Sequence, residues 1–121
     1  IVKSVSFLGF CNNILDYYKK ASIFVLSSRF EGFGMVLTEA MSQGCACIAC
    51  DFNGRQREII QDDNQGIICS NDNYVELSNA IKRMIDDNQY REKCRINAIE
   101  RSKYYSLDKT IDRWEKIFQS L

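Results

Sequence analysis

Two acidic residues enclose a pair of glycines near the end of the first third of the chain. The segment reads Glu31-Gly32-Phe33-Gly34, and seven residues separate Glu31 from Glu39. Glycines let the backbone approach a ligand closely and turn sharply into a following helix. The start of such a helix offers unpaired N–H groups and a positive dipole end, which suit a phosphate.

The two carboxylates suit another part of the same ligand. Carboxylates repel phosphates, so we expect Glu31 and Glu39 to accept hydrogen bonds from hydroxyl groups beside the phosphate. Two acceptor oxygens on each carboxylate match a vicinal diol of ribose or of a sugar ring. A phosphate flanked by two polyols describes a nucleotide sugar. A structural turn with solvated acids is the alternative, because Gly-x-Gly before a helix is weak evidence alone.

Short apolar runs alternate with amphipathic stretches around this segment. We predict strands at residues 5–8, 23–26, 47–49 and 66–69. The run at 23–26 is apolar throughout, as in a strand that is covered on both faces. A loop at 27–34 then leads into a helix at about 35–43, which Gly44 ends. In parallel α/β folds ligands bind beyond the carboxyl ends of the strands, and the loop lies there.

Helices are predicted between the first two strands and throughout the last part of the chain. Asn12 or Asn13 is expected to cap a helix with an inward face of Ile14, Leu15, Tyr18 and Ala21. Asn73 and Glu76 resemble a capping box before a helical face of Leu77, Ala80, Ile81, Met84 and Ile85. Asn88 and Ser106 are expected to cap the last two helices, the final one with a stripe of Leu107, Ile111, Trp114, Phe118 and Leu121. This order of elements predicts an α/β layered fold with a parallel sheet and a helical tail.

Composition excludes several function classes. The chain has 121 residues with 16 basic and 16 acidic side chains, which fits a single domain and argues against nucleic-acid binding. It has no histidine, so Ser-His-Asp and Cys-His catalysis and histidine-ligated metals are excluded within this chain. Its apolar runs are far shorter than the ~20 residues that cross a bilayer, so no transmembrane segment is predicted.

The six cysteines are interpreted as reduced core residues of a cytoplasmic protein. The spacing of Cys45, Cys47 and Cys50 also permits a metal or iron–sulfur site. Alternation along a strand, however, would turn Cys45 and Cys47 away from Cys50. We therefore expect no metal site.

The combined motifs resemble the family-four glycosyltransferases of GT-B fold. The resemblance rests on the Glu31 to Glu39 segment with Ala40-Met41 and Gly44, on the stretches at 7–9, 21–28, 58–60 and 66–68, and on Asn53-Gly54. It implies a Rossmann-like, three-layer fold and identifies residues 1–121 as a single domain, the latter part of the carboxy-terminal, donor-binding domain. The amino-terminal, acceptor-binding domain would lie outside this chain. The opening without Met, directly into a strand-like run, also suggests a fragment.

The resemblance assigns roles residue by residue. Glu31 would contact the donor sugar at the reacting centre, and Glu39 would bind the ribose hydroxyls. The backbone of Gly32, Phe33, Gly34 and Met35 would hold the sugar and the pyrophosphate, Leu37 would line the ribose side, and Phe10 and Cys11 would frame the base.

Two positions depart from the family pattern. Asn53-Gly54 replaces a pair of glycines, and Ala46 replaces a proline. Arg55 and Arg57, in the altered loop, are candidates for contacts with a phosphate or an acceptor group. Their alternative interpretation is as solvated loop cations.

The implied activity is transfer of a hexose from a nucleotide diphosphate sugar, with retention of configuration and without a cofactor. The acceptor would be a saccharide or a lipid-linked group in bacterial surface polysaccharide synthesis, at the inner face of the membrane. The leaving phosphate can take the proton, so a histidine base is not required. The alternatives are a nucleotide-sugar epimerase of the same architecture and a non-catalytic nucleotide-binding module.

The family's strand order, 3-2-1-4-5-6, makes a further prediction. The chain would begin at the third strand, so residues 5–8 and 23–26 would lack neighbours. Unpaired strand edges and exposed apolar stripes promote association. We expect these two strands to pair directly, or the chain to dimerise through them and the final helix.

Overall fold

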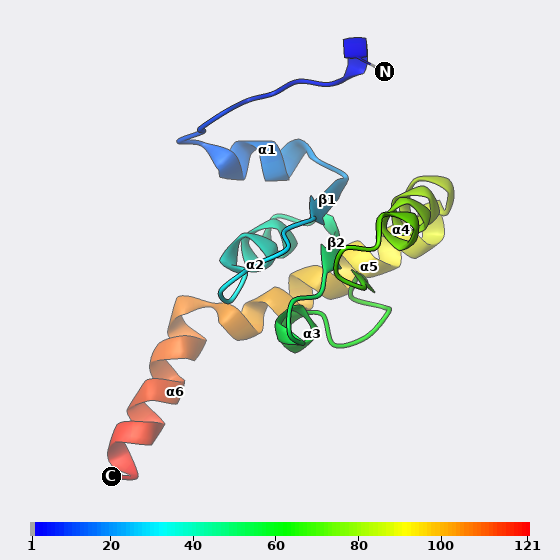
Figure 1. The fold of residues 1–121 in the computed structure, drawn as a ribbon. Helices are drawn as coiled ribbons and strands as arrows, with labels where there is room; N and C mark the ends of the chain where they lie inside the picture. The colour runs from blue at the N-terminus through cyan, green and yellow to red at the C-terminus, as the bar shows by residue number, and fades with distance from the viewer. Residues whose placement is uncertain (1) are drawn as a thin grey trace.

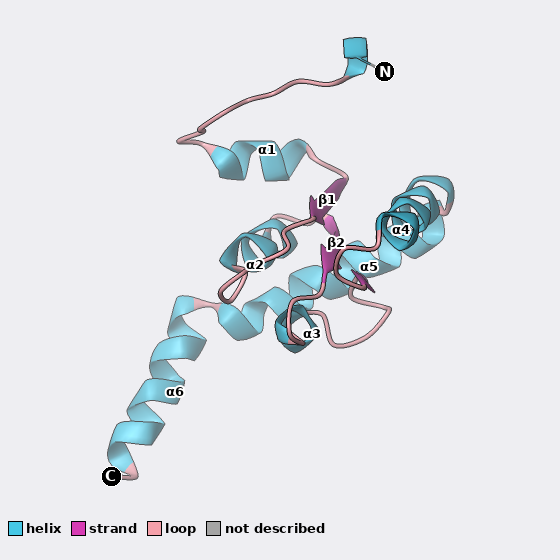
Figure 2. Cartoon of the chain, in the orientation of Figure 1, coloured by secondary structure: helices cyan, strands magenta, loops and turns pink. Residues whose placement is uncertain are grey.

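Strands and helices alternate from residue 14 to residue 69, and helices alone follow (Figures 1 and 2). This computed structural model describes residues 2–121. The strands are β1 (Ile23–Leu26), β2 (Ala46–Cys50) and β3 (Ile67–Cys69). The helices among them are α1 (Ile14–Lys20), α2 (Met35–Ser42) and α3 (Arg55–Ile59), and those after them are α4 (Tyr74–Asp86), α5 (Asn88–Ser102) and α6 (Leu107–Gln119). Two short 3-10 turns complete the list, η1 (Val2–Ser4) and η2 (Lys103–Tyr105).

The sheet has three parallel strands in the order β1-β2-β3. Val25 of β1 lies opposite Ile48 of β2, and Ile48 lies opposite Ile67 of β3. Every residue of the central strand β2 is buried. The predicted parallel sheet and its strands at 23–26, 47–49 and 66–69 are therefore confirmed.

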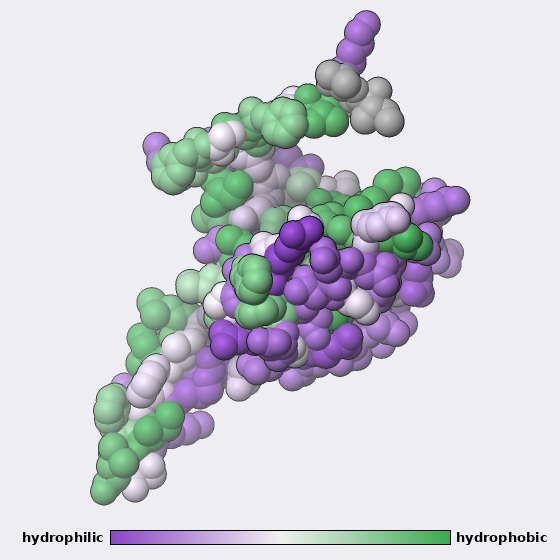
Figure 3. Space-filling model, viewed as in Figure 1, coloured by the Kyte–Doolittle hydropathy of each residue, from purple (hydrophilic) through white to green (hydrophobic). Residues whose placement is uncertain are grey.

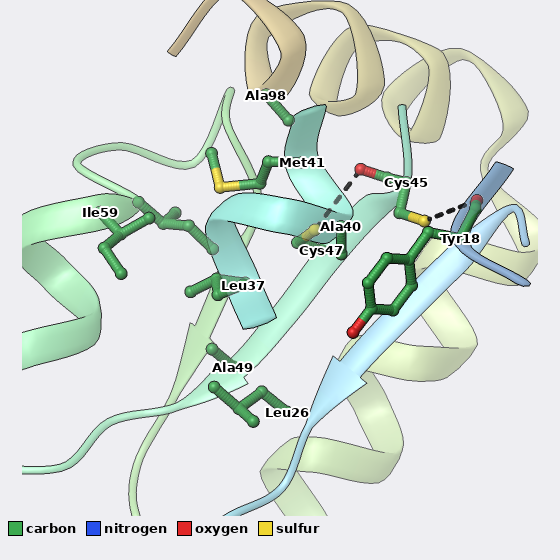
Figure 4. Close-up of a cluster of buried hydrophobic side chains, with 11 residues drawn as sticks. Tyr18, Leu26, Leu37, Ala40, Met41, Cys45, Cys47, Ala49, Ile59 and Ala98 are labelled. Carbon is green, nitrogen blue, oxygen red and sulfur yellow. Dashed lines mark hydrogen bonds between the residues drawn. The ribbon is translucent and has the colours of Figure 1, made fainter. Parts of the chain in front are cut away.

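Alternating residues of β2 belong to two cores on opposite faces of the sheet. Cys47 and Ala49 pack in a cluster with side chains of α1, α2 and α3 (Figure 4). Ala46 and Ile48 pack in a second cluster with α4. Helix α5 contributes to both clusters. The sheet thus lies between helices, as the predicted three-layer fold requires.

The cysteines are free thiols, and all except Cys11 are buried. Cys45 and Cys47 belong to one core cluster and Cys50 to the other, so the predicted alternation is confirmed. This arrangement excludes a metal site shared by the three thiols. Burial raises the pKa of the Cys47 thiol well above its ordinary value and that of Cys69 to about 11, so both stay protonated at neutral pH.

The predicted strand at residues 5–8 is wrong. These residues form an irregular, exposed segment, and Figure 1 shows it running apart from the sheet. The side chain of Phe7 is 98% exposed. A strand is stable only when its backbone groups find hydrogen-bond partners, and within residues 2–121 this segment pairs with no strand. The predicted direct pairing of residues 5–8 with 23–26 is therefore wrong as well.

Helix α1 only partly follows its prediction. Asn13 takes the N-cap position, although its side chain makes no capping hydrogen bond to any described residue. Tyr18 is buried and packs edge-on against Phe24, with ring centroids 5.4 Å apart. Ile14 and Leu15 are exposed instead of inward, because α1 is covered mainly by α2.

Capping residues define the helices of the tail. The Asn73 side chain accepts a hydrogen bond from the Glu76 N–H at 3.1 Å, and that of Ser106 accepts one from Lys109 at 3.4 Å, so both predicted caps are confirmed. Helix α5 is capped by Asp87, whose carboxylate accepts from the Tyr90 N–H at 2.9 Å. The prediction of Asn88 as this cap is wrong by one residue. The Asp87 carboxylate also suits the positive end of the helix dipole.

Helix α6 extends away from the rest of the molecule and carries an exposed apolar stripe (Figures 1 and 3). Its apolar side chains, all 45% exposed or more, are Leu107, Ile111, Trp114, Ile117 and Phe118. The rings of Trp114 and Phe118 stack with centroids 5.8 Å apart. The predicted exposure of this stripe is confirmed, whereas Ile85 of α4, predicted to face inward, is 57% exposed.

None of the helices described between residues 2 and 121 is long and apolar enough to span a membrane.

Replacing Gly66 by alanine is expected to destabilise the fold by about 1–3 kcal/mol, as overpacking does. A Cβ at this position would lie 2.6 Å from the Cys47 carbonyl oxygen and 2.9 Å from Cδ1 of Ile60. Cys47 belongs to the central strand, so its backbone cannot move without disturbing both strand pairs. Urea unfolding followed by circular dichroism measures the change.

Gly32→Ala is the matched control, because an added Cβ there meets no described atom within 4 Å. We expect it to change the free energy of unfolding by less than about 0.5 kcal/mol. Equal unfolding midpoints for the two variants would contradict the predicted clash.

Candidate functional site

The loop at residues 27–34 connects the carboxyl end of β1 to the start of α2 (Figure 1). Gly34 takes the N-cap position in the left-handed region, with φ of 82°, a conformation that favours glycine. Its carbonyl accepts from the Leu37 N–H at 2.9 Å, which begins the helix. Glycine has no side chain to cap the helix, so the first N–H groups of α2 remain available to a ligand.

Residues of α3 and of the loop after β3 hold this segment at several points. The guanidinium of Arg55 donates to the Gly32 carbonyl at 3.0 Å. The amide of Asn71 donates to the Arg29 carbonyl at 3.1 Å. The Arg29 side chain also pairs with Asp72 at 3.1 Å, but both groups are more than 70% exposed, so this ion pair contributes little to stability. Two polar contacts, one from the first residue of α3 and one from the loop after β3, therefore fix the backbone on either side of Glu31.

Aromatic contacts add to this support. Phe30 packs edge-on against Phe52, with ring centroids 5.3 Å apart. Phe33 packs in the same way against Tyr105, at 5.5 Å. The aromatic residues before and after Glu31 are thus held by different parts of the fold, the loop after β2 and the turn η2.

The two predicted carboxylates lie on either side of the helix start. Glu31 is half-buried, directly before the glycine turn, and Glu39 is half-buried in the second turn of α2. Glu39 lines a cavity of about 500 Å³ between α2 and the η2 region. Met35, Thr38 and Ser42 line its α2 side, and Ser102, Lys103 and Tyr105 lie opposite. The cavity is large enough for part of a polar ligand beside Glu39.

The structure brings only some of the predicted residues together. One continuous segment that leads into α2 contains Glu31, Gly32, Phe33, Gly34 and Met35. Arg55 contacts this segment through its hydrogen bond to the Gly32 carbonyl. The Met35 side chain is 66% exposed, whereas those of Leu37 and Met41 are buried in the core.

The remaining predicted residues lie elsewhere. The Leu37 side chain is fully buried in the core below α2 and does not reach an open surface. Phe10 and Cys11 precede α1, and Figure 1 shows that segment beyond α1, apart from the loop. Arg57 donates from Nε to the Asp51 carboxylate at 3.0 Å, at the end of β2. Contacts of these four residues with a ligand stay predictions.

The supporting residues Phe52, Asn71 and Tyr105 were not predicted from the sequence. Phe52 and Asn71 each follow a strand by two residues, so their place at the carboxyl edge of the sheet is a signal that could have identified them. Tyr105 lies beyond the strands, in the tail, and no local pattern relates it to Phe33.

A family comparison agrees with this arrangement. The family model described as "Glycosyl transferases group 1" matches residues 1–101 of the 121-residue chain. The chain belongs to the group 1 glycosyltransferases. The fold described above is accordingly the Rossmann-like α/β fold of GT-B proteins.

Curated relatives of this group 1 glycosyltransferase chain include two bacterial enzymes. One is the N-acetylgalactosamine-N,N'-diacetylbacillosaminyl-diphospho-undecaprenol 4-alpha-N-acetylgalactosaminyltransferase of Campylobacter jejuni, 33% identical over 85% of this chain and 28% of its own length. Another is the poly(glycerol-phosphate) alpha-glucosyltransferase of Bacillus subtilis, 28% identical over 88% of this chain and 16% of its own length.

A solved structure extends the likeness to the fold of nearly the whole chain. HepE of Anabaena, in complex with UDP, superposes with a TM-score of 0.91 and 25% identity over 99% of this chain and 33% of its own. The group 1 glycosyltransferase chain thus spans about a third or less of the length of these three proteins.

Proposed function

We propose that this chain is the latter part of the donor-binding domain of a retaining glycosyltransferase. The observation that carries the proposal is the loop at residues 27–34, which places Glu31 and two glycines at the open start of α2, with Glu39 one turn further on. The HepE structures support a nucleotide-sugar donor, since they contain UDP, and one of them contains glucose as well. The acceptor-binding domain would lie outside residues 1–121.

The proposed chemistry assigns one task to each part of the site. The N–H groups and positive dipole end of α2 would stabilise the charge of the leaving diphosphate. Glu31 would stabilise positive charge at the anomeric carbon, and Glu39 would accept hydrogen bonds from the ribose hydroxyls.

The bond changes of the proposed transfer balance without a histidine or a cofactor. The acceptor oxygen bonds to the anomeric carbon from the face that the phosphate leaves, while the bond between that carbon and the phosphate oxygen breaks. The leaving phosphate takes the hydroxyl proton, so configuration is retained and a nucleoside diphosphate is released. This scheme needs no histidine base, and the chain has no histidine.

The names of the relatives support a bacterial polysaccharide or lipid-linked acceptor. The Campylobacter jejuni relative is named for an undecaprenol-linked substrate, and the Bacillus subtilis relative for poly(glycerol-phosphate). We infer that this protein extends a saccharide or a lipid-linked group in surface polysaccharide synthesis. Nucleotide sugars are cytoplasmic metabolites, so we place the reaction in the cytoplasm, at the inner face of the membrane.

A panel of UDP- and GDP-sugars, offered to the whole protein with saccharide and lipid-linked acceptors, tests this proposal. We expect transfer from one donor, with NMR showing the donor's anomeric configuration kept in the product. Conversion of the donor sugar without an acceptor would instead support an epimerase. Saturable nucleotide binding with neither reaction, over the full panel, would support a binding module.

The 121-residue chain by itself is expected to self-associate through α6. Its apolar stripe is exposed over the length of the helix, and such a patch drives association in water. Sedimentation equilibrium should show an average mass that rises with concentration. Replacing Trp114 and Phe118 together by serine should abolish the rise, whereas Lys116→Ser, on the polar side of α6, should leave it unchanged. A monomer at every concentration would contradict this prediction.

A further inference from the structure

Tyr105 occupies the joint between the body of the molecule and α6. It is the last residue of η2, the turn between α5 and α6, and α6 makes its main contact with η2. Figure 1 shows the chain changing direction at this point. The Tyr105 ring nevertheless points back toward the body, where it packs against the core cluster that surrounds α2.

The Tyr105 hydroxyl is fixed at the end of α3. It donates to the Glu58 carbonyl at 2.9 Å and accepts from the Arg101 guanidinium at 2.9 Å. Arg101 also donates to the carbonyls of Glu58 at 2.7 Å and of Ile59 at 3.0 Å. Three hydrogen bonds from α5 and η2 therefore cap the final carbonyls of α3, and the Tyr105 ring is held by an anchored hydroxyl.

The Tyr105 ring contacts the candidate site at Phe33. Its centroid lies 5.5 Å from that of Phe33, at an interplanar angle of 61°, an edge-on geometry that aromatic pairs favour. Phe33 stands between Gly32 and Gly34, the residues that allow this backbone the most conformations. Because Phe33 is the only side chain between the two glycines, a contact that holds its ring also restricts the backbone on both sides.

We propose that Tyr105 is a positioning residue for the donor site. Its anchored ring holds Phe33, and thereby keeps the N–H groups between Gly32 and Gly34 in the arrangement that receives the donor's sugar and phosphates. The functional part of this inference rests on the proposed nucleotide-sugar function. The contact itself does not, so the two can be tested separately.

Hydrogen exchange of the loop tests the contact in the 121-residue chain. We expect Tyr105→Leu to speed amide exchange across residues 31–34 by at least about fivefold, because the loop opens more often. Tyr105→Phe keeps the ring but loses the hydroxyl's hydrogen bonds to Glu58 and Arg101, so its exchange should be faster than in the unmodified chain and slower than in Tyr105→Leu. Phe33→Leu breaks the contact from the other side and should reproduce the Tyr105→Leu effect, so the test survives if Tyr105→Leu fails to fold.

Tyr104→Leu is the matched control. The Tyr104 ring lies beside the guanidinium groups of Arg101 and Arg113, at 4.7 and 4.2 Å, and not against Phe33. The Tyr104 and Tyr105 rings also pack against each other, with centroids 5.1 Å apart. The control therefore measures any loosening of the loop that arises indirectly, through loss of this ring contact. Equal loop exchange in Tyr104→Leu and Tyr105→Leu, or unchanged exchange in Phe33→Leu, would overturn the proposed role.

Donor kinetics of the whole protein test the functional part. Tyr105→Leu should raise the donor KM by at least about fivefold, Tyr105→Phe should raise it less, and Tyr104→Leu should not change it. If the loop loosens while the donor KM stays the same, the contact is real but the positioning role is wrong. If the unmodified protein binds no nucleotide sugar, the proposed function fails, and the positioning role fails with it.

Discussion

Replacing Glu31 by glutamine in the whole protein should lower kcat at least about tenfold while the donor KM changes little. A carboxylate near the reacting sugar stabilises positive charge that develops at the anomeric carbon, and this interaction is strongest in the transition state. Glutamine has nearly the same shape and keeps hydrogen-bonding capacity, so the substitution removes mainly the charge. Initial rates over a range of donor concentrations separate kcat from KM.

The backbone around Glu31 is held by contacts that do not involve the Glu31 side chain. Arg55 holds the Gly32 carbonyl and Asn71 holds that of Arg29, so the backbone around Glu31 is supported by contacts that the substitution does not touch. Glu115→Gln, the same change on the exposed surface of α6, is the control and should leave the kinetics unchanged. A kcat for Glu31→Gln within about twofold of the unmodified protein would limit the charge effect to ~0.4 kcal/mol and contradict the assigned role.

Local patterns predicted the part of the fold that local forces decide. The strands β1 and β2 are apolar runs bounded by polar or glycine residues, and the glycines at 32, 34 and 44 mark the two ends of α2. These features depend on residues close in sequence, so they can be recognised without a structure. The alternation of strands and helices predicted the parallel sheet, and the family resemblance supplied the order of its strands, which no local pattern contains.

The errors arose where structure depends on distant partners. Residues 5–8 have strand-like composition, but a strand also needs a neighbour for its backbone hydrogen bonds. Ile14, Leu15 and Ile85 follow helical spacing, yet they are exposed because the surrounding elements do not cover them. Burial is a property of the neighbours as well as of the residue.

In the candidate site, too, the residues close in sequence were predicted and the contacts between distant residues were not. Glu31, Gly32, Gly34 and Glu39 were identified because they lie in one short segment with a recognisable spacing. The sequence indicates Arg55 as a candidate ligand contact, whereas in the structure it donates to the loop backbone. Tyr105 meets Phe33 only because α5 returns the chain to the candidate site, and spacing along a sequence does not record such a return.

Glu39→Ala should act on donor binding instead of on the chemical step. Hydrogen bonds to a charged group contribute about 1.5–3 kcal/mol, so their loss should raise the donor KM by roughly 10- to 100-fold. The ribose lies outside the bonds that change, so its contacts persist through the reaction, and their loss should leave kcat nearly unaltered. Thr38→Ala, at the neighbouring position on the same cavity, is the control and should change the donor KM much less. Because the two glutamates lie on either side of the helix start, the assignment depends on the ranking of the two variants. A kcat defect in Glu39→Ala together with a KM defect in Glu31→Gln would mean that the two roles are exchanged.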